Sequence, residues 1–194
     1  MIKDKSKILI EKNGMKIAKQ DTNDYTVEFS VYNNQFILPA IINFDMVKLI
    51  FDLNPDIYEK SILKKNTLDN VTILSLMKDL YSDLGIPQSY VCMSVDIFRS
   101  NNSINFRCNP LKDRTTPLEF RGIPNLYLMP FKNMVFDCKI ITNHHVELVC
   151  RIKAEDDVEI EPFIEKMLIN VVNKIFIRLK QFIENLTFNN TKTI

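Results

Sequence analysis

The chain has 194 residues, of which 46% are hydrophobic and 25% charged, and its formal net charge is +1. This length allows about two thirds of the unfolded chain's surface to be buried, and the composition is that of a globular protein rather than a disordered one. The small net charge excludes a strong overall electrostatic field for binding nucleic acid. From the length and composition we expect one self-folding domain over residues 1–194.

The cysteines and the apolar runs indicate the compartment. The first twenty residues lack an apolar run long enough for a signal peptide, and no stretch approaches the roughly 18 apolar residues of a membrane span. The 4 cysteines form no CxxC pair and are expected to be buried free thiols. We therefore expect a protein of the cytoplasm or another reducing intracellular compartment. Residues 1–7 form a basic segment and residues 188–194 a short flexible tail.

Two hairpins are predicted near the start of the chain. The Asn-Gly pair at residues 13–14 lies between apolar runs and favours a type I′ turn, because both residues tolerate positive φ. This turn sets Ile10 opposite Ile17. An Asn-Asn pair at residues 33–34 predicts a second two-residue loop, in a hairpin over residues 25–40.

The central part of the chain is predicted to be helical at residues 44–64 and 71–84. Asn54 precedes a proline and marks either a break or a second helix start in the first stretch. Asn70 caps the second stretch, and Gly85 ends it.

A third hairpin follows the predicted helices. The runs at residues 90–98 and 104–108 alternate apolar and polar side chains, which is typical of strands. A two-residue loop at residues 100–101 sets Val95 opposite Phe106.

Residues 108–125 contain three prolines, no regular period and both signs of charge. Such a segment is either a plain connection or an exposed binding loop, since binding residues often lie in loops on a rigid scaffold. If the loop binds, Arg114 and Arg121 are its candidate contact residues.

The fourth hairpin contains both histidines of the chain beside two of its cysteines. A three-residue loop at residues 143–145 sets Cys138 opposite Cys150 inside and Asp137 opposite Arg151 outside. The cysteines then lie roughly 14 Å from the turn, whereas zinc ligands lie within roughly 2.3 Å of one ion. A two-residue loop would send the cysteines to opposite faces. We therefore expect no metal site and no cofactor here, with the histidines as exposed turn residues.

A helix over residues 162–187 ends the regular part of the chain. Its apolar residues cover about half of the circumference, whereas a surface helix needs a stripe of only about 100°. Phe163, Met167 and Ile177 lie outside even this wide arc, so we expect them to form a partner-binding outer face.

The predicted fold is α+β, with an antiparallel sheet of about seven to eight strands packed against the long C-terminal helix and shorter central helices. In outline, hairpins followed by a long helix resemble both helix-grip ligand-binding domains and saddle-like sheet-plus-helix domains. Such an outline does not fix the function.

Three functions are compatible with this sequence. Glycines occur only at positions 14, 85 and 122, so the GxGxxG, P-loop and GxSxG motifs of common enzymes are missing, and we expect no enzyme. The first hypothesis is a non-enzymatic interaction protein that binds a protein partner or itself through the C-terminal helix. The alternative is a carrier of a small, lipid-like ligand with a pocket between the sheet and this helix. A nucleic-acid-binding accessory factor comes third, because the basic N-terminal segment has no aromatic residues.

Overall fold

The computed structural model describes residues 6–79, 82–113 and 115–187. Within these ranges it contains one sheet of ten strands: β1 (Lys7–Lys12), β2 (Met15–Asp21), β3 (Asp24–Tyr32), β4 (Tyr58–Lys65), β5 (Asn70–Met77), β6 (Ser89–Arg99), β7 (Ser103–Pro110), β8 (Tyr127–Leu128), β9 (Phe131–Thr142) and β10 (His145–Ala154). Nine of them follow the order β1-β2-β3-β10-β9-β7-β6-β5-β4, and β8 pairs in parallel with β6. All other pairings are antiparallel.

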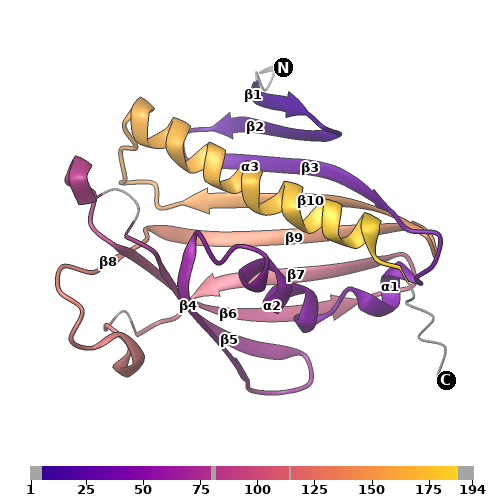
Figure 1. The fold of residues 1–194 in the computed structure, drawn as a ribbon, viewed down its shortest axis with the longest axis horizontal. Helices are drawn as coiled ribbons and strands as arrows, with labels where there is room; N and C mark the ends of the chain where they lie inside the picture. Colours follow the sequence, from indigo (N-terminus) through magenta and orange to yellow (C-terminus); the bar gives the residue numbers. More distant parts are fainter. Residues whose placement is uncertain (1–5, 80–81, 114, 188–194) are drawn as a thin grey trace, which may run out of the picture.

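The helices complete an α+β architecture. They are α1 (Leu38–Ile41), α2 (Phe44–Asp52) and α3 (Pro162–Asn185), with short 3₁₀ turns η1 (Ser82–Leu84) and η2 (Leu118–Phe120). Helices α2 and α3 cover the same face of the sheet, and most of α3 lies across that face (Figure 1). The predicted fold class, an antiparallel sheet packed against a long C-terminal helix, is confirmed.

The first hairpin has the predicted register. Asn13 and Gly14 have φ values of 55° and 68°, as a type I′ turn requires, and Ile10 pairs with Ile17. Because an Asn-Gly pair determines both turn type and loop length, the register followed directly from the sequence.

The second predicted hairpin is wrong. Strand β3 ends at Tyr32, and the chain continues into the short helix α1 instead of turning back. The buried side chain of Asn33 donates to the carbonyl oxygens of Ile183 and Leu186 at the end of α3, at 2.7 and 3.0 Å. The side-chain oxygen Oδ1 of Asn33 accepts from the backbone amide of Gln35 at 2.8 Å. Asn33 therefore anchors the end of α3, a role that depends on residues 150 positions away.

The predicted helix over residues 44–64 is correct only for α2, and the one over 71–84 is replaced largely by β5. Asn43 caps α2, since its side-chain oxygen accepts from the amide of Asp45. Beyond α2 the chain forms the hairpin β4–β5. Strand β5 is covered on both faces, so its sequence shows a nearly continuous apolar run instead of alternation. Such a run cannot be distinguished from a buried helix by periodicity alone.

The two later hairpins exist, but both registers differ by two residues from the predicted ones. Phe106 pairs with Ile97 rather than with Val95. In the histidine hairpin, Leu148 pairs with Cys138, because a bulge follows His145. The bulge keeps Cys138 and Cys150 on the inner face, and each is 0% exposed.

Candidate functional site

A cavity of about 230 Å³ lies between the sheet and the two helices that cover it. Its floor comes from strands β4, β5, β6, β7, β9 and β10, and its cover from α2 and α3. Val47, Ile50 and Phe51 contribute from α2, and Val172 and Phe176 from α3. An engineered apolar cavity of about 150 Å³ stays dry and takes up benzene, so a space of this size and character suits an apolar molecule.

A second cavity, of about 150 Å³, adjoins the first under the N-terminal half of α3. Ile17 and Val27 line it from the sheet, and Ile169 lines it from the helix. Five side chains line both cavities and form the wall between them: Met129, Phe131, Ile152, Leu168 and Val172. These five side chains are all apolar, so the two cavities adjoin through an apolar wall.

Few polar groups reach the larger cavity. Among the described residues that line it, none is charged, and the oxygen-bearing side chains are those of Tyr58 and Ser75. The Ser75 hydroxyl pairs with that of Ser61 at 3.0 Å. Burial raises the pKa of the Tyr58 hydroxyl, which therefore stays protonated as a potential donor.

The second cavity has a charged end. The Glu165 carboxylate lines it and accepts hydrogen bonds at 2.5 Å from both Lys19 and the Tyr25 hydroxyl. These bonds, with that from Lys19 as the larger cause, lower the pKa of Glu165. Burial and the neighbouring carboxylate raise the pKa of Tyr25. This cluster joins the start of α3 to strands β2 and β3 and leaves Glu165 ionised and paired at neutral pH.

A network of polar side chains fastens the loop after α2 to α3. Arg178 donates to the side-chain oxygen of Asn54 at 3.0 Å and to the carboxylate of Asp56. Lys174 contacts the same carboxylate at 2.5 Å. Bonds from Arg178 and then Lys174 hold the pKa of Asp56 well below its usual range. The network, which we call the α2–α3 clasp (Asn54, Asp56, Lys174 and Arg178), holds the two covering helices of the larger cavity together.

The predicted outer face of the C-terminal helix is only partly exposed. Phe163 is 57% exposed, whereas Met167 and Ile177 are half-buried. Ile177 packs against the main core cluster. Binding of a partner by these three residues stays a prediction.

The segment at residues 108–125 covers the other face of the sheet. Phe120 is 0% exposed and forms a second apolar cluster with Leu74, Leu76, Tyr90 and Cys92. The segment thus acts structurally as a cover. Arg121 is exposed, and Arg114 lies outside the described residues, so contacts by this pair also stay a prediction.

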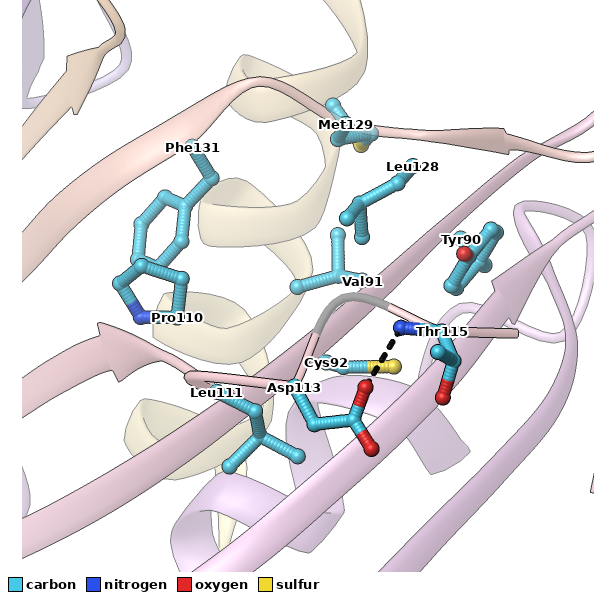
Figure 2. Close-up of a pocket in the computed structure, with 10 residues that line it drawn as sticks. All are labelled: Tyr90, Val91, Cys92, Pro110, Leu111, Asp113, Thr115, Leu128, Met129 and Phe131. Atoms are coloured by element: carbon cyan, nitrogen blue, oxygen red, sulfur yellow. Dashed lines mark hydrogen bonds between the residues drawn. The ribbon is translucent and has the colours of Figure 1, made fainter. Parts of the chain in front are cut away.

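A small pocket lies beside this segment (Figure 2). The Thr115 amide donates to the Asp113 carboxylate at 2.9 Å at its rim, and Tyr90 and Cys92 lie nearby. Its volume is about 10 Å³, which is no more than one water molecule needs. We therefore place the candidate site in the large cavities under α3.

The histidine hairpin gathers no set of metal ligands. Among the residues that the structure describes, no group of three or more histidine, cysteine or acidic side chains could hold a metal ion. The ring Nδ1 of His144 lies 2.9 Å from the carbonyl oxygens of Asn33 and Phe36, and the ring of His145 stacks on Tyr32 at 3.9 Å. His144 is exposed in the turn, as expected, and contacts the segment that follows β3, whereas His145 is half-buried at the start of β10 and contacts the last residue of β3.

The sequence alone did not reveal the polar residues of the larger cavity. Tyr58 and Ser75 were assigned to helices, so their common orientation in a β-hairpin could not be seen. A usable signal was present in Val71, Thr72 and Ile73, a run of β-branched residues that favours a strand.

Comparison with known proteins identifies structures of the same fold but no family related in sequence. No protein-family model matches the chain, and no curated protein matches it in sequence. No helix in the described parts of the chain has the length and apolar character needed to cross a membrane.

Solved structures match over nearly the whole chain. The human StarD13 (DLC2) lipid transfer and protein localization domain has a TM-score of 0.70 at 5% identity, covering 93% of this chain and 90% of that one. Human StAR-related lipid transfer protein 5 has a TM-score of 0.65 at 12% identity, covering 92% and 86%. A STAR-related lipid transfer protein from Xanthomonas axonopodis has a TM-score of 0.64 at 12% identity, covering 93% and 99%. At these identities the likeness is one of fold, and this chain has the fold of the StAR-related lipid transfer structures.

Proposed function

We propose that this chain is a non-enzymatic carrier of a small, lipid-like molecule that binds between the sheet and α3. The observation that carries the proposal is the apolar cavity of about 230 Å³ under α2 and α3, with its apolar extension of about 150 Å³. Apolar pockets with a few placed polar groups are the usual form of small-molecule sites. The shared fold with proteins named for lipid transfer supports the same assignment.

The carrier proposal has more support than the interaction hypothesis. A partner surface on α3 needs exposed apolar side chains, and of Phe163, Met167 and Ile177 only Phe163 is mainly exposed. Binding of a protein partner or a second copy through these residues is therefore a second, weaker proposal. Both proposals describe binding rather than catalysis.

Filling the cavity tests the proposal directly. Val172 lines both cavities, so Val172→Phe places a ring in the space that the ligand needs. Nile red, an uncharged dye that fluoresces strongly in apolar surroundings, serves as the probe. We expect the wild-type protein to bind Nile red with saturation, and Val172→Phe to lower the affinity at least tenfold.

The matched control places the same ring elsewhere on the helix. Asn170 is exposed on α3, so Asn170→Phe adds apolar surface without entering either cavity. Its affinity for Nile red should equal that of the wild type. Equal loss in both variants, or no saturable binding by the wild type after removal of any co-purified ligand, would contradict the proposal.

A further inference from the structure

The chemistry of the larger cavity restricts the class of ligand. Resting on the proposed function, we infer that the ligand is an uncharged amphiphile with a hydroxyl or carbonyl oxygen, and that the hydroxyl of Tyr58 is the group that binds this oxygen. The inference depends on three observations: the lining of the cavity, the contacts of Tyr58, and the state of the charged groups at the far end.

The lining disfavours a charged head group. In the described parts of the chain, no Lys, Arg, His, Asp or Glu side chain lines the larger cavity, and the thiol there, that of Cys108, has its pKa raised by burial to about 12. A phosphate or carboxylate in this space would be desolvated without a counter-charge, which is strongly unfavourable. An uncharged polar group that needs one hydrogen bond does not carry this cost of desolvating a charge.

Tyr58 has the geometry of a polar anchor. Its ring packs edge-on against Phe51 of α2 at 4.9 Å, and both residues line the cavity. Among the described residues its hydroxyl has no hydrogen-bond partner. Tyr58 is half-buried and its hydroxyl is not fully enclosed, so an oxygen of the ligand can take the place of solvent as the acceptor of its hydrogen bond.

The neighbouring polar group is already paired. Tyr58 is opposite Met77 on β5, so Ser75 lies two residues along the same strand and on the same side of the sheet. Because the Ser75 hydroxyl pairs with Ser61, Tyr58 is the oxygen-bearing side chain of the lining that is free to bind a ligand.

The charged side chains at the end of the second cavity do not compete with Tyr58 for the polar group of the ligand. Glu165 already accepts from Lys19 and Tyr25, and the other charged residue of that lining, Lys153, pairs with Asp156 at 3.4 Å. The apolar body of the ligand is therefore expected to extend from Tyr58 under α3 toward the shared wall. Met129 in this wall is flexible enough to yield to a longer chain.

Three compounds of equal chain length test the inference: decan-1-ol, decanoic acid and 1-chlorodecane. Each is measured at pH 7 by displacement of Nile red, whose own affinity is first determined for every variant. Tyr58→Phe removes only the hydroxyl. We expect it to weaken decan-1-ol about 3- to 10-fold and to leave 1-chlorodecane unchanged or tighter, because chlorine is a poor acceptor. Comparing each compound between the two proteins cancels differences in solubility.

The matched control removes a hydroxyl from the opposite face of the sheet. Tyr90 packs on Phe120 in the second cluster, so Tyr90→Phe should change none of the affinities. In the wild type, decan-1-ol should bind more tightly than the ionised decanoic acid.

The possible failures are distinguishable. An equal loss for decan-1-ol and 1-chlorodecane in Tyr58→Phe would show that Tyr58 acts by shape alone, and would overturn its role as anchor. Tighter binding of decanoic acid than of decan-1-ol by the wild type would overturn the uncharged class while leaving the carrier intact. If neither Nile red nor any of the compounds binds the wild type, the proposed function itself fails.

Discussion

Cys108, Cys138 and Cys150 lie on three strands of the sheet and face its inner side. Each is buried, and burial is the main cause of a raised pKa for all three thiols. Burial likewise raises the pKa of Cys92, in the second cluster, to about 11. A thiol reacts as its thiolate, so these environments make all four cysteines inert in the folded protein.

Thiol reactivity can be checked with Ellman's reagent at pH 8. We expect no rapid reaction in the folded state, since the thiols are protonated and inaccessible to this charged reagent. In guanidinium chloride, all 4 cysteines should react quickly. A fast burst from the native protein would show that at least one thiol is exposed.

At the scale of single residues, the sequence predicted which side chains are buried better than it predicted their hydrogen-bond partners. Free, buried cysteines followed from their spacing and type, and the positive φ of Asn13 and Gly14 followed from the turn motif. The role of Asn33 did not, because its hydrogen bonds reach the end of α3 rather than its own neighbours. A polar side chain that binds an element far away in the sequence produces no recognisable motif in the residues around it.

Between elements, the α2–α3 clasp joins the two helices that cover the larger cavity. Its carboxylate, Asp56, is bound by Arg178 and Lys174, but the side chain is 42% exposed. Solvent screens such pairs, so we expect a contribution to the free energy of unfolding of about 1 kcal/mol or less. The folded-state pKa of Asp56 lies below that of an unfolded aspartate, which is about 3.9. The contribution is therefore present above about pH 4 and is lost as the pH falls through the folded-state pKa.

Asp56→Asn tests the clasp by urea unfolding. At pH 7 the variant should be less stable than the wild type by about 1 kcal/mol or less, and the difference should shrink as the pH is lowered to 3 and below. Asp52→Asn serves as control, since Asp52 pairs with Lys48 on the exposed side of α2 and takes no part in the α2–α3 clasp. A difference that is constant over this pH range would show that charge at Asp56 is not the cause.

Among the elements, most of those with one buried face were predictable, whereas β5, which is buried on both faces, was not. The long helix α3 and strands β2, β3, β7, β9 and β10 show the helical or alternating patterns of elements that have one solvent-exposed side. Strand β5 packs against the main core on one face and against Phe120 and its neighbours on the other, so alternation is lost. The register of the histidine hairpin was missed because a bulge adds a residue that no composition rule reveals.

Taken as a whole, the molecule has apolar walls that are not fully packed against each other. Side chains around a void lose dispersion contacts, so the ligand-free protein is less stable than a filled one. A ligand that binds only the folded state adds about 2.7 kcal/mol at a concentration of 100 times Kd. For a chain of this size, that corresponds to a rise in Tm of about 5 to 10 °C.

Thermal unfolding with and without decan-1-ol measures this coupling. We expect the Tm of the wild type and of Asn170→Phe to rise with the concentration of the alcohol. The Tm of Val172→Phe should stay nearly constant, because its ring occupies the site. A rise of equal size in Val172→Phe would place the bound alcohol somewhere other than under α3.

The global arrangement was only partly contained in the sequence. The α+β class and the long covering helix follow from hydrophobic periodicity, and a pocket under this helix is the second of the three functional hypotheses that the sequence allows. The neighbours in the sheet were not predictable, since β3 pairs with β10 across more than a hundred residues. The cavity depends on this pairing, because strands from both halves of the chain form its floor.

The covering helix α3 follows every strand in chain order. During synthesis on the ribosome, a nascent chain that has completed β10 therefore has α2 but not yet α3 to cover its apolar floor. The part of the floor that α3 covers stays open until this helix docks. Apolar molecules of the host cell can enter at that stage and be enclosed when α3 docks, and protein purified in the native state then carries them. Complete unfolding and refolding in lipid-free buffer is accordingly the way to prepare an empty molecule.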